Sequence, residues 1–472
     1  MFSRASTINR RRLRVLFPLT LAMLALLLST SVGLAHSNLE RSDPANGAIL
    51  RQAPTEVRLW FTEDLEPDFT RAVVYAGNRQ PVSTASRVDS QNPRLLTLNI
   101  NPNLANGWYV IEWQAQAKLD GHLTRGAVSF GIGVTGPPPD IAAAVNAAQS
   151  GSGSVLEVAL RWLILLSTIV IVGSFAFWGM QSQVLTRGPR PPTRVRILPG
   201  QWAFAELAWI LFMLANVIFL INAVANASNV SSLDDLGPPL VQLTTQTTFG
   251  QIWLARMALA SLLWVALLYR GNRCPSPWDR IALVLGGGLL LCFSLTSHSA
   301  AVRTLAPVAV ANDWLHFAAV TIWIGGLLQL AIVFAAPAKN PAEPSGTEIR
   351  RALVRRFAAI ATYALAMVVV TGLSEALFHV VTPYNLVHSR YGLVVVLKTL
   401  LVIPLVALAA VHHWRIRPAL ARQSLEQISP LASRPVGRGS LESWFAWSIR
   451  FEALWAVLII AAVGLLTSLS PP

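Results

Sequence analysis

Histidine and aspartate residues near the N-terminus form the first group able to bind a metal ion. The chain has eight histidines, and His122 lies in the sequence Leu119-Asp120-Gly121-His122. Residues i and i+2 of an extended segment share a face, so Asp120 and His122 would present an oxygen and an imidazole together. A mature chain beginning at His36 would add a terminal amine and a second imidazole to one chelate ring. Three nitrogens and one oxygen in a plane suit Cu(II), although a surface Asp-Gly-His is also commonly a simple turn.

A second group of ionisable residues borders apolar segments later in the chain. His298, His316 and His379 each lie near the end of such a segment, and Glu375 lies one turn before His379 on the same helical face. Ionisable side chains inside a bilayer are costly and usually line a pathway or pair with each other. We expect these three imidazoles and the carboxylate to converge near the outer mouth of a membrane bundle as a candidate metal site. Other charged residues of the apolar half are interpreted as structural ion pairs without an assigned role: Arg161, Glu206, Arg256, Lys398 and Glu452.

Composition indicates a membrane protein. Hydrophobic residues make up 53% of the chain and charged residues 13%, fewer charges than a soluble protein of this size carries. The net charge of +14 does not predict nucleic-acid binding, because basic residues precede the first apolar run or gather in alternate loops. The two cysteines, Cys274 and Cys292, form no CxxC pair, so neither a thiolate metal site nor a disulfide framework is predicted.

The first 156 residues contain three different kinds of segment. Residues 1–35 have a basic start, an apolar stretch and the small-x-small tripeptide Gly33-Leu34-Ala35, which predicts a signal peptide, with an uncleaved anchor as the alternative. Residues 36–134 alternate in hydrophobicity between turn-forming clusters, which predicts an all-β, immunoglobulin-like sandwich. Residues 135–156, with Pro, Gly, Ala and Ser, form a linker. Because this linker is flexible, we expect the metal affinities of the two halves to be nearly independent.

Residues 157–472 are predicted to form an all-α membrane domain. Apolar runs long enough to cross a hydrocarbon core of about 30 Å predict eight transmembrane helices. Their approximate ranges are 157–180, 202–223, 250–270, 281–297, 314–336, 357–379, 391–412 and 451–469. The loops after the first, third, fifth and seventh spans are basic, so they face the cytoplasm. The chain is therefore predicted to cross the cytoplasmic (inner) membrane several times, with the sandwich and the C-terminus on the periplasmic side.

Three stretches of the sandwich carry a resemblance to a known family. They are His36-Ser37-Asn38-Leu39 running to Ser42-Asp43-Pro44-Ala45-Asn46-Gly47, then Leu59-Trp60-Phe61-Thr62-Glu63, then Leu119-Asp120-Gly121-His122 ending in Ser129-Phe130. In order and spacing they resemble the CopC family of periplasmic copper-binding proteins. The resemblance implies a Cu(II) site with His36, Asp120 and His122 as ligands. It also implies Glu63 as an additional, weaker ligand, for which a solvated carboxylate is the alternative.

The absence of methionine from residues 36–134 bears on the oxidation state of the bound copper. Some CopC proteins also carry a methionine-rich Cu(I) site, and Cu(I) prefers thioether sulfur. We therefore expect the sandwich to bind Cu(II) alone.

The membrane domain carries a second resemblance. Its most specific pieces are Leu295-Thr296-Ser297-His298-Ser299-Ala300-Ala301 and Asp313-Trp314-Leu315-His316-Phe317, running on to Trp323-Ile324-Gly325-Gly326-Leu327. These resemble the CopD family, which is associated with copper uptake or copper tolerance. The whole chain resembles a CopC–CopD fusion. The implied partners are copper ions, the lipid bilayer and other copper-handling proteins outside the membrane, with no nucleic acid.

The predicted function is copper import or homeostasis, in which the sandwich captures Cu(II) and the bundle passes copper inward. The sequence contains no nucleotide-binding motif to drive such transport. Sequestration, tolerance or sensing without net transport is the main alternative. A copper-brace enzyme or a b-type haem redox protein is less favoured, because Asp120 would fill a copper position that oxygen chemistry needs open. The chain is therefore predicted not to be an enzyme.

Overall fold

A computed structural model of the chain describes the two predicted domains. The described residues are 39–101, 103–136, 154–186, 198–228, 230, 232–270, 276–302, 305–335, 344–379, 383–411 and 438–468. The predicted signal peptide, His36 and most of the predicted linker lie outside these residues.

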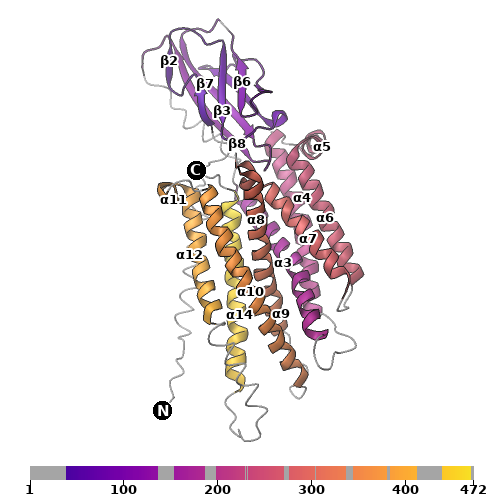
Figure 1. Cartoon of the computed structure of the whole chain (residues 1–472). Coiled ribbons are helices and arrows are strands. Elements are labelled where there is room, and N and C mark those ends of the chain that lie inside the picture. The colour runs from indigo at the N-terminus through magenta and orange to yellow at the C-terminus, as the bar shows by residue number, and fades with distance from the viewer. Residues whose placement is uncertain are drawn as a thin grey trace.

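The N-terminal domain is a β-sandwich of two four-stranded sheets (Figure 1). One sheet has the order β1 (Leu39–Asp43), β3 (Glu56–Phe61), β6 (Leu95–Asn99) and β5 (Arg87–Val88). The other has the order β2 (Ala48–Leu50), β8 (Leu123–Ile132), β7 (Gly107–Gln116) and β4 (Arg71–Ala76). Strands β2 and β8 pair in parallel, and the remaining neighbours are antiparallel. Alternate residues face the core: Val57, Leu59 and Phe61 of β3 are at most 1% exposed, as the period of two predicts.

The β7–β8 hairpin connects the sandwich with the helices. Its two ten-residue strands pair without interruption from Gly107↔Ile132 to Gln116↔Leu123. The hairpin loop, residues 117–122, contains Asp120 and His122. Figure 1 shows β8 at the end of the sandwich nearest the helical bundle.

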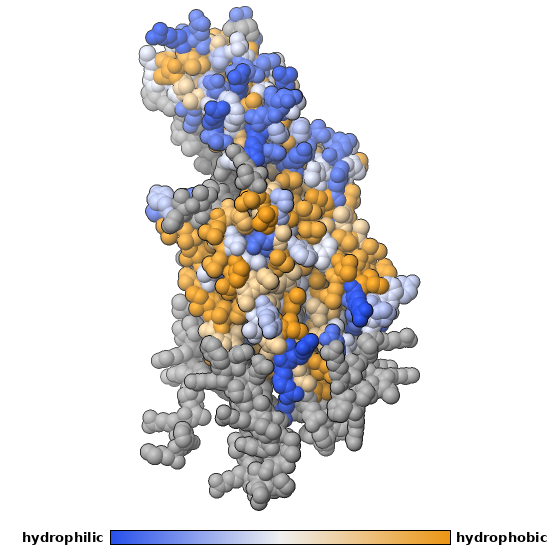
Figure 2. Space-filling model, viewed as in Figure 1, coloured by the Kyte–Doolittle hydropathy of each residue, from blue (hydrophilic) through white to orange (hydrophobic). Residues whose placement is uncertain are grey.

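The C-terminal domain is a helical bundle, and eight helices among the described residues are long and apolar enough to cross a membrane. They are α3 (Val155–Thr186), α4 (Pro199–Ser228), α6 (Thr248–Arg270), α7 (Trp278–Leu295), the composite of α8 (Ala306–Val320), η4 (Thr321–Gly325) and α9 (Gly326–Ala335), α10 (Pro344–His379), α12 (Arg390–Val411) and α14 (Arg438–Leu466). Shorter elements are η1 (Pro67–Phe69), η2 (Leu233–Leu236), α5 (Gly237–Gln246), η3 (His298–Ala301) and α11 (Pro383–His388). The predicted number and order of spans are confirmed. Figure 2 shows the apolar surface of the bundle below the polar sandwich.

Helix α3 lies at the centre of the bundle, where it contacts α4, α7, α9, α10 and α14. At its middle, a Cβ atom on Gly173 would lie 2.6 Å from the Gly325 Cα, so only glycine permits this crossing. Gly325 ends the π-helical turn η4, which interrupts the fifth span. Such π turns re-aim the residues beside them and often occur near functional sites.

Candidate metal centre at the domain interface

A tight turn in the β7–β8 loop brings Asp120 and His122 together. The His122 amide donates to Asp120 Oδ1 at 2.9 Å, and Gly121 has φ of +68°, a conformation that glycine adopts readily. The Ala117 amide donates to the His122 carbonyl at 2.8 Å and closes the loop. As a result, His122 Nδ1 lies 3.5 Å from Asp120 Oδ2. The prediction of an extended segment here is wrong, because a turn brings the two side chains together.

Both side chains are buried, with 8% of the Asp120 side chain and 4% of the His122 side chain exposed. Burial by itself raises the pKa of Asp120, but the hydrogen bonds from His122 and the charges of His122 and His298 outweigh it. The pKa of Asp120 is therefore held well below its usual range. At neutral pH, Asp120 is therefore an ionised oxygen donor beside the His122 imidazole. A carboxylate oxygen together with an imidazole nitrogen is a donor set that suits Cu(II).

Glu63 lies beside this pair because the segment after β3 runs along the β7–β8 loop. The Lys118 amide donates to the Asp64 carbonyl at 2.9 Å, and Leu65 bridges to Ala117. Burial, together with the nearby charge of Asp120, raises the pKa of Glu63 to about 8. In the metal-free protein, Glu63 is therefore mainly protonated at neutral pH.

The pH dependence of Cu(II) affinity should report on Glu63. Its pKa is raised to about 8, so the side chain gains its negative charge only as pH rises through that value. The charge attracts the cation, so wild-type affinity should rise further between about pH 7 and pH 9 than that of Glu63→Gln. As pH falls further, both proteins should lose affinity because the imidazole ligands become protonated. Competition titrations with a chelator across this range measure the effect, and superimposable pH curves would contradict it.

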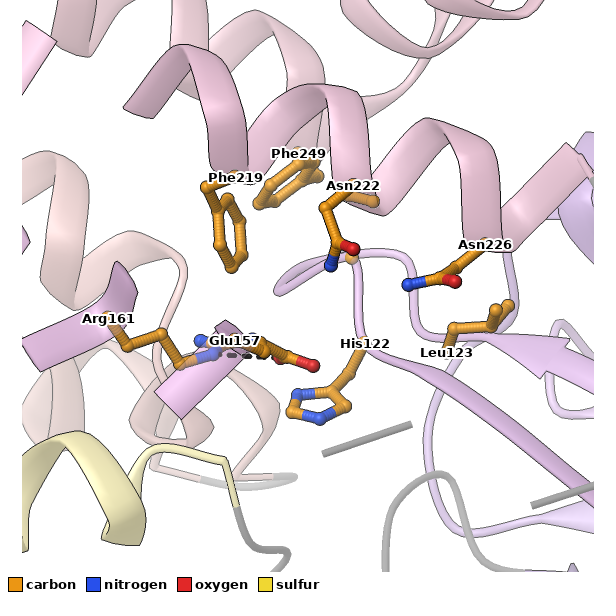
Figure 3. Close-up of a pocket in the computed structure, with 10 residues that line it drawn as sticks. His122, Leu123, Glu157, Arg161, Phe219, Asn222, Asn226 and Phe249 are labelled. Atoms are coloured by element: carbon orange, nitrogen blue, oxygen red, sulfur yellow. Dashed lines mark hydrogen bonds and ion pairs between the residues drawn. The ribbon is translucent and has the colours of Figure 1, made fainter. Parts of the chain in front are cut away.

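A cavity of about 30 Å³ lies between the loop and the membrane helices, which is room for about one or two water molecules. His122 of the loop and Glu157 of α3 both line this cavity (Figure 3). Glu157 pairs with Arg161 at 2.8 Å, which confirms the interpretation of Arg161 as part of a structural ion pair. Glu157 is not among the residues predicted from the sequence. The sequence feature that could have identified Glu157 is that it is an acidic residue in the first turn of the first span.

The sandwich docks on the end of helix α4. Gln114 Nε2 donates to the Ala227 carbonyl at 2.7 Å, and Arg125 Nη2 donates to the Asn226 carbonyl at 2.6 Å. Helix α4 ends at Ser228, so these carbonyls belong to its last turn, which lacks partners within the helix. A cationic side chain is also favourable at this negative end of the helix dipole.

A close approach between Gly121 and Phe249 of α6 adds to the docking. A Cβ atom on Gly121 would lie 2.7 Å from Phe249 Cγ, so the loop fits against the ring only with glycine there. Phe69 of the sandwich is 5% exposed and belongs to the same buried cluster as the membrane helices. The Asp120–His122 loop is thus pressed against the membrane domain.

His298 of the membrane domain lies against the sandwich site. It is the first residue of η3, and its Nδ1 lies 3.8 Å from Asp120 Oδ2. Its ring packs edge-on against Tyr391, with centroids 6.4 Å apart. The prediction of nearly independent metal affinities assumed that the sites of the two domains are separate. This assumption is wrong, because the Asp120 carboxylate adjoins a histidine of each domain.

Glu375 and His316 lie farther from the sandwich, in a chain of polar contacts. Ser299 Oγ donates to Glu375 Oε2 at 3.2 Å, and Asn312 Nδ2 donates to Glu375 Oε1 at 2.7 Å. Asn312 Nδ2 also donates to the Thr371 carbonyl at 3.1 Å, and His316 Nδ1 lies 2.8 Å from Thr371 Oγ1. We call this series the polar line, and its members are Asp120, His298, Ser299, Glu375, Asn312, Thr371 and His316.

The predicted convergence of histidines at one mouth needs correction. His316 lies ten residues into α8, about 15 Å along the helix axis from Ala306, and contacts Thr371. His379 is the last residue of α10, and its side chain lies outside the described part of the chain. His298 and Glu375 are linked through Ser299 near the sandwich, whereas His316 forms the deeper end of the polar line.

Two residues that the sequence analysis left without a role accompany the polar line. Asp313 accepts a hydrogen bond from Ser297 Oγ at 3.1 Å. Lys398 lies within electrostatic reach of the carboxylates of Glu375 and Asp313. The signal for Asp313 was its position in the same motif as His316.

Across the described ranges, no three His, Cys, Asp or Glu side chains are already set around a common point to hold a metal ion.

Three family matches cover most of the chain. The CopC domain matches residues 39–133, the copper resistance protein D-like N-terminal domain matches residues 152–306, and copper resistance protein D matches residues 351–466. These descriptions concern copper handling and name no catalysed reaction.

Two relatives found by sequence similarity agree with these matches. Copper transport protein CutJ of Bacillus subtilis (strain 168) is 28% identical over 396 residues, which are 83% of this chain and 70% of that protein. Copper resistance protein D of Pseudomonas syringae pv. tomato is 26% identical over 320 residues, 67% of this chain and 97% of that protein. The crystal structure of CopC from Methylosinus trichosporium OB3b shares 27% sequence identity, covers 21% of this chain and 93% of its own, and gives a TM-score of 0.20. In order along the chain, a match to the CopC domain is thus followed by two matches to copper resistance protein D domains, so the chain resembles a CopC domain joined to a CopD-type membrane domain.

Proposed function

We propose that this protein captures Cu(II) outside the cytoplasmic membrane with its sandwich and passes copper inward through its helical bundle. The observation that best supports transport is the polar line, which runs from Asp120 of the sandwich to His316 inside the fifth span. Polar and ionisable residues within a bilayer are costly and usually mark ion pathways. Sequestration of copper outside the membrane would need the sandwich site but not a polar line inside the bundle.

The chemistry of the proposed sandwich site fits Cu(II). Asp120 supplies an ionised oxygen and His122 an imidazole, and His36 would add an imidazole and a terminal amine after signal-peptide cleavage. Glu63 would serve as a weaker ligand beside them. Nitrogen and carboxylate donors in this combination favour Cu(II) over Cu(I), and each must be deprotonated to bind. Transfer inward then proceeds by exchange of one donor for the next along the polar line.

The proposed orientation places the sandwich and the C-terminus on the periplasmic side. The end of α14 supports it, because Leu465 and Leu466 pack against the small cluster formed by Tyr391 and Val394. Tyr391 also contacts His298, which adjoins the sandwich. The last span therefore ends at the same end of the bundle as the sandwich, and the basic loops after the odd-numbered spans would lie in the cytoplasm.

Copper content of cells tests import against tolerance. Cells that express the protein should accumulate more copper than deletion cells at low external copper, because a captured ion gains a route inward. The measurement is cellular copper by mass spectrometry of washed cells, normalised to cell mass. Equal copper content together with greater survival at high external copper would contradict import and favour sequestration outside the membrane. One relative is named for copper transport and another for copper resistance, so the names of similar proteins include both functions that this experiment separates.

A further inference from the structure

The Asp120 carboxylate lies between one imidazole of the sandwich and one of the membrane domain. Its Oδ2 atom is 3.5 Å from His122 Nδ1 and 3.8 Å from His298 Nδ1. All three side chains are largely buried, with 8% of Asp120, 4% of His122 and 15% of His298 exposed. His122 of the sandwich and His298 of the membrane domain are 176 residues apart in the sequence, yet both lie beside the same carboxylate.

These separations suit donors that share one copper ion. A metal–imidazole bond is about 2.0 Å long, so adjacent donors in a square plane are about 2.8 Å apart and opposite donors about 4.0 Å apart. Both distances from Asp120 Oδ2 lie between these two values, so each imidazole would have to shift by less than about 1 Å to reach an adjacent or an opposite position. Because no three donors among the described residues already surround one point, metal binding requires a small rotation of the imidazole rings. Side-chain rotations of this kind are fast compared with domain movements.

The contacts around the site hold the two domains in the necessary register. Gln114 and Arg125 bind the last-turn carbonyls of α4 on one side of the loop, while Gly121 packs against Phe249. On the membrane side, the Ser297 side chain accepts a hydrogen bond from the Ser299 amide and caps the short helix that begins with His298. The position of His298 beside Asp120 therefore follows from contacts on both sides of the interface.

We propose that His298 is a ligand of the same copper ion that Asp120 and His122 bind, so that capture and entry occur at one site shared by the two domains. This inference rests on the proposed function, because it requires copper at the sandwich site. Entry then begins with ligand exchange, in which His298 retains the ion as a sandwich donor leaves. The next polar groups along the line are Ser299, which follows His298 in the chain, and Glu375, which Ser299 contacts.

The test uses the full chain in lipid nanodiscs, loaded with one equivalent of Cu(II) sulfate. Pulsed electron paramagnetic resonance detects the remote nitrogen of each imidazole bound to Cu(II). The wild-type spectrum should contain one more coupled imidazole than that of His298→Ala, and this variant should bind Cu(II) about tenfold more weakly or worse. His388→Ala is the matched control, since His388 is an exposed histidine stacked on Tyr384 in the same half of the chain.

A second variant tests the interface without altering any proposed ligand. Gln114→Ala combined with Arg125→Ala removes both hydrogen bonds to α4 and should lose the same imidazole coupling as His298→Ala, while the coupling from His122 remains. Identical spectra and affinities for wild type and His298→Ala would overturn the shared site but leave the proposed function intact. If His122→Ala also left the Cu(II) spectrum unchanged, copper would not bind at the sandwich site, and the proposed function would fail with the inference.

Discussion

A His122→Ala variant of the full chain is expected to bind Cu(II) more than about 100-fold more weakly than the wild type. Loss of a residue that only supports a metal ligand already costs about 10- to 100-fold, and removal of a ligand should cost more. The turn itself should survive, because Asp120 Oδ1 accepts its hydrogen bond from the backbone amide of residue 122, which alanine retains. The expected loss therefore reflects the missing imidazole.

Competition titration against a chelator of known affinity measures this loss, and the copper spectrum should show a weaker nitrogen contribution. Glu63→Gln should have a smaller effect, about 10- to 100-fold if the carboxylate acts as a supporting group. His388→Ala should leave affinity unchanged, since its exposed ring stacks on Tyr384 with centroids 3.9 Å apart, whereas the imidazoles beside Asp120 are those of His122 and His298. Wild-type affinity in His122→Ala would exclude this side chain as a ligand.

Copper accumulation is expected to be abolished by His316→Ala and by Glu375→Gln. Glu375 accepts hydrogen bonds from Ser299 and Asn312, and its negative charge lies between the sandwich site and the deeper His316. Glutamine keeps the size of the side chain but cannot carry a negative charge, so a copper cation loses the attraction of one of the two carboxylates, Glu375 and Asp313, that lie near Lys398. His316→Ala removes the donor at the inner end of the polar line.

Uptake of copper into cells or vesicles, normalised to the amount of membrane protein, measures both effects. Ser374→Ala is a suitable control, because Ser374 is the neighbour of Glu375 but bonds only the Val370 carbonyl of its own helix among the contacts described. The Cu(II) spectrum of the sandwich site should persist in His316→Ala, since His316 contacts Thr371 and not Asp120. Normal accumulation in both variants would remove the polar line from the mechanism and favour sequestration.

Local sequence patterns were sufficient to predict the two domains. The length and apolarity of a membrane span are properties of one continuous segment, so eight spans could be counted without knowing how they pack. The alternation of hydrophobicity in residues 36–134 likewise predicted a sandwich, and in Glu56–Phe61 the alternate residues Val57, Leu59 and Phe61 lie in its core. Asp120 and His122 were identified as a pair because they are two residues apart, although their backbone is a turn and not a strand.

The positions of the remaining site residues depend on contacts between distant segments. His298 adjoins Asp120 only because Gln114 and Arg125 bind the end of α4 and Gly121 fits against Phe249. Glu375 joins the polar line, and His316 lies deeper than His298, because α8 and α10 pack side by side. No periodicity within one segment encodes which helix faces another or where a sandwich docks. The donor types could therefore be predicted from the sequence, whereas the shared position of His122, Asp120 and His298 was decided by tertiary packing.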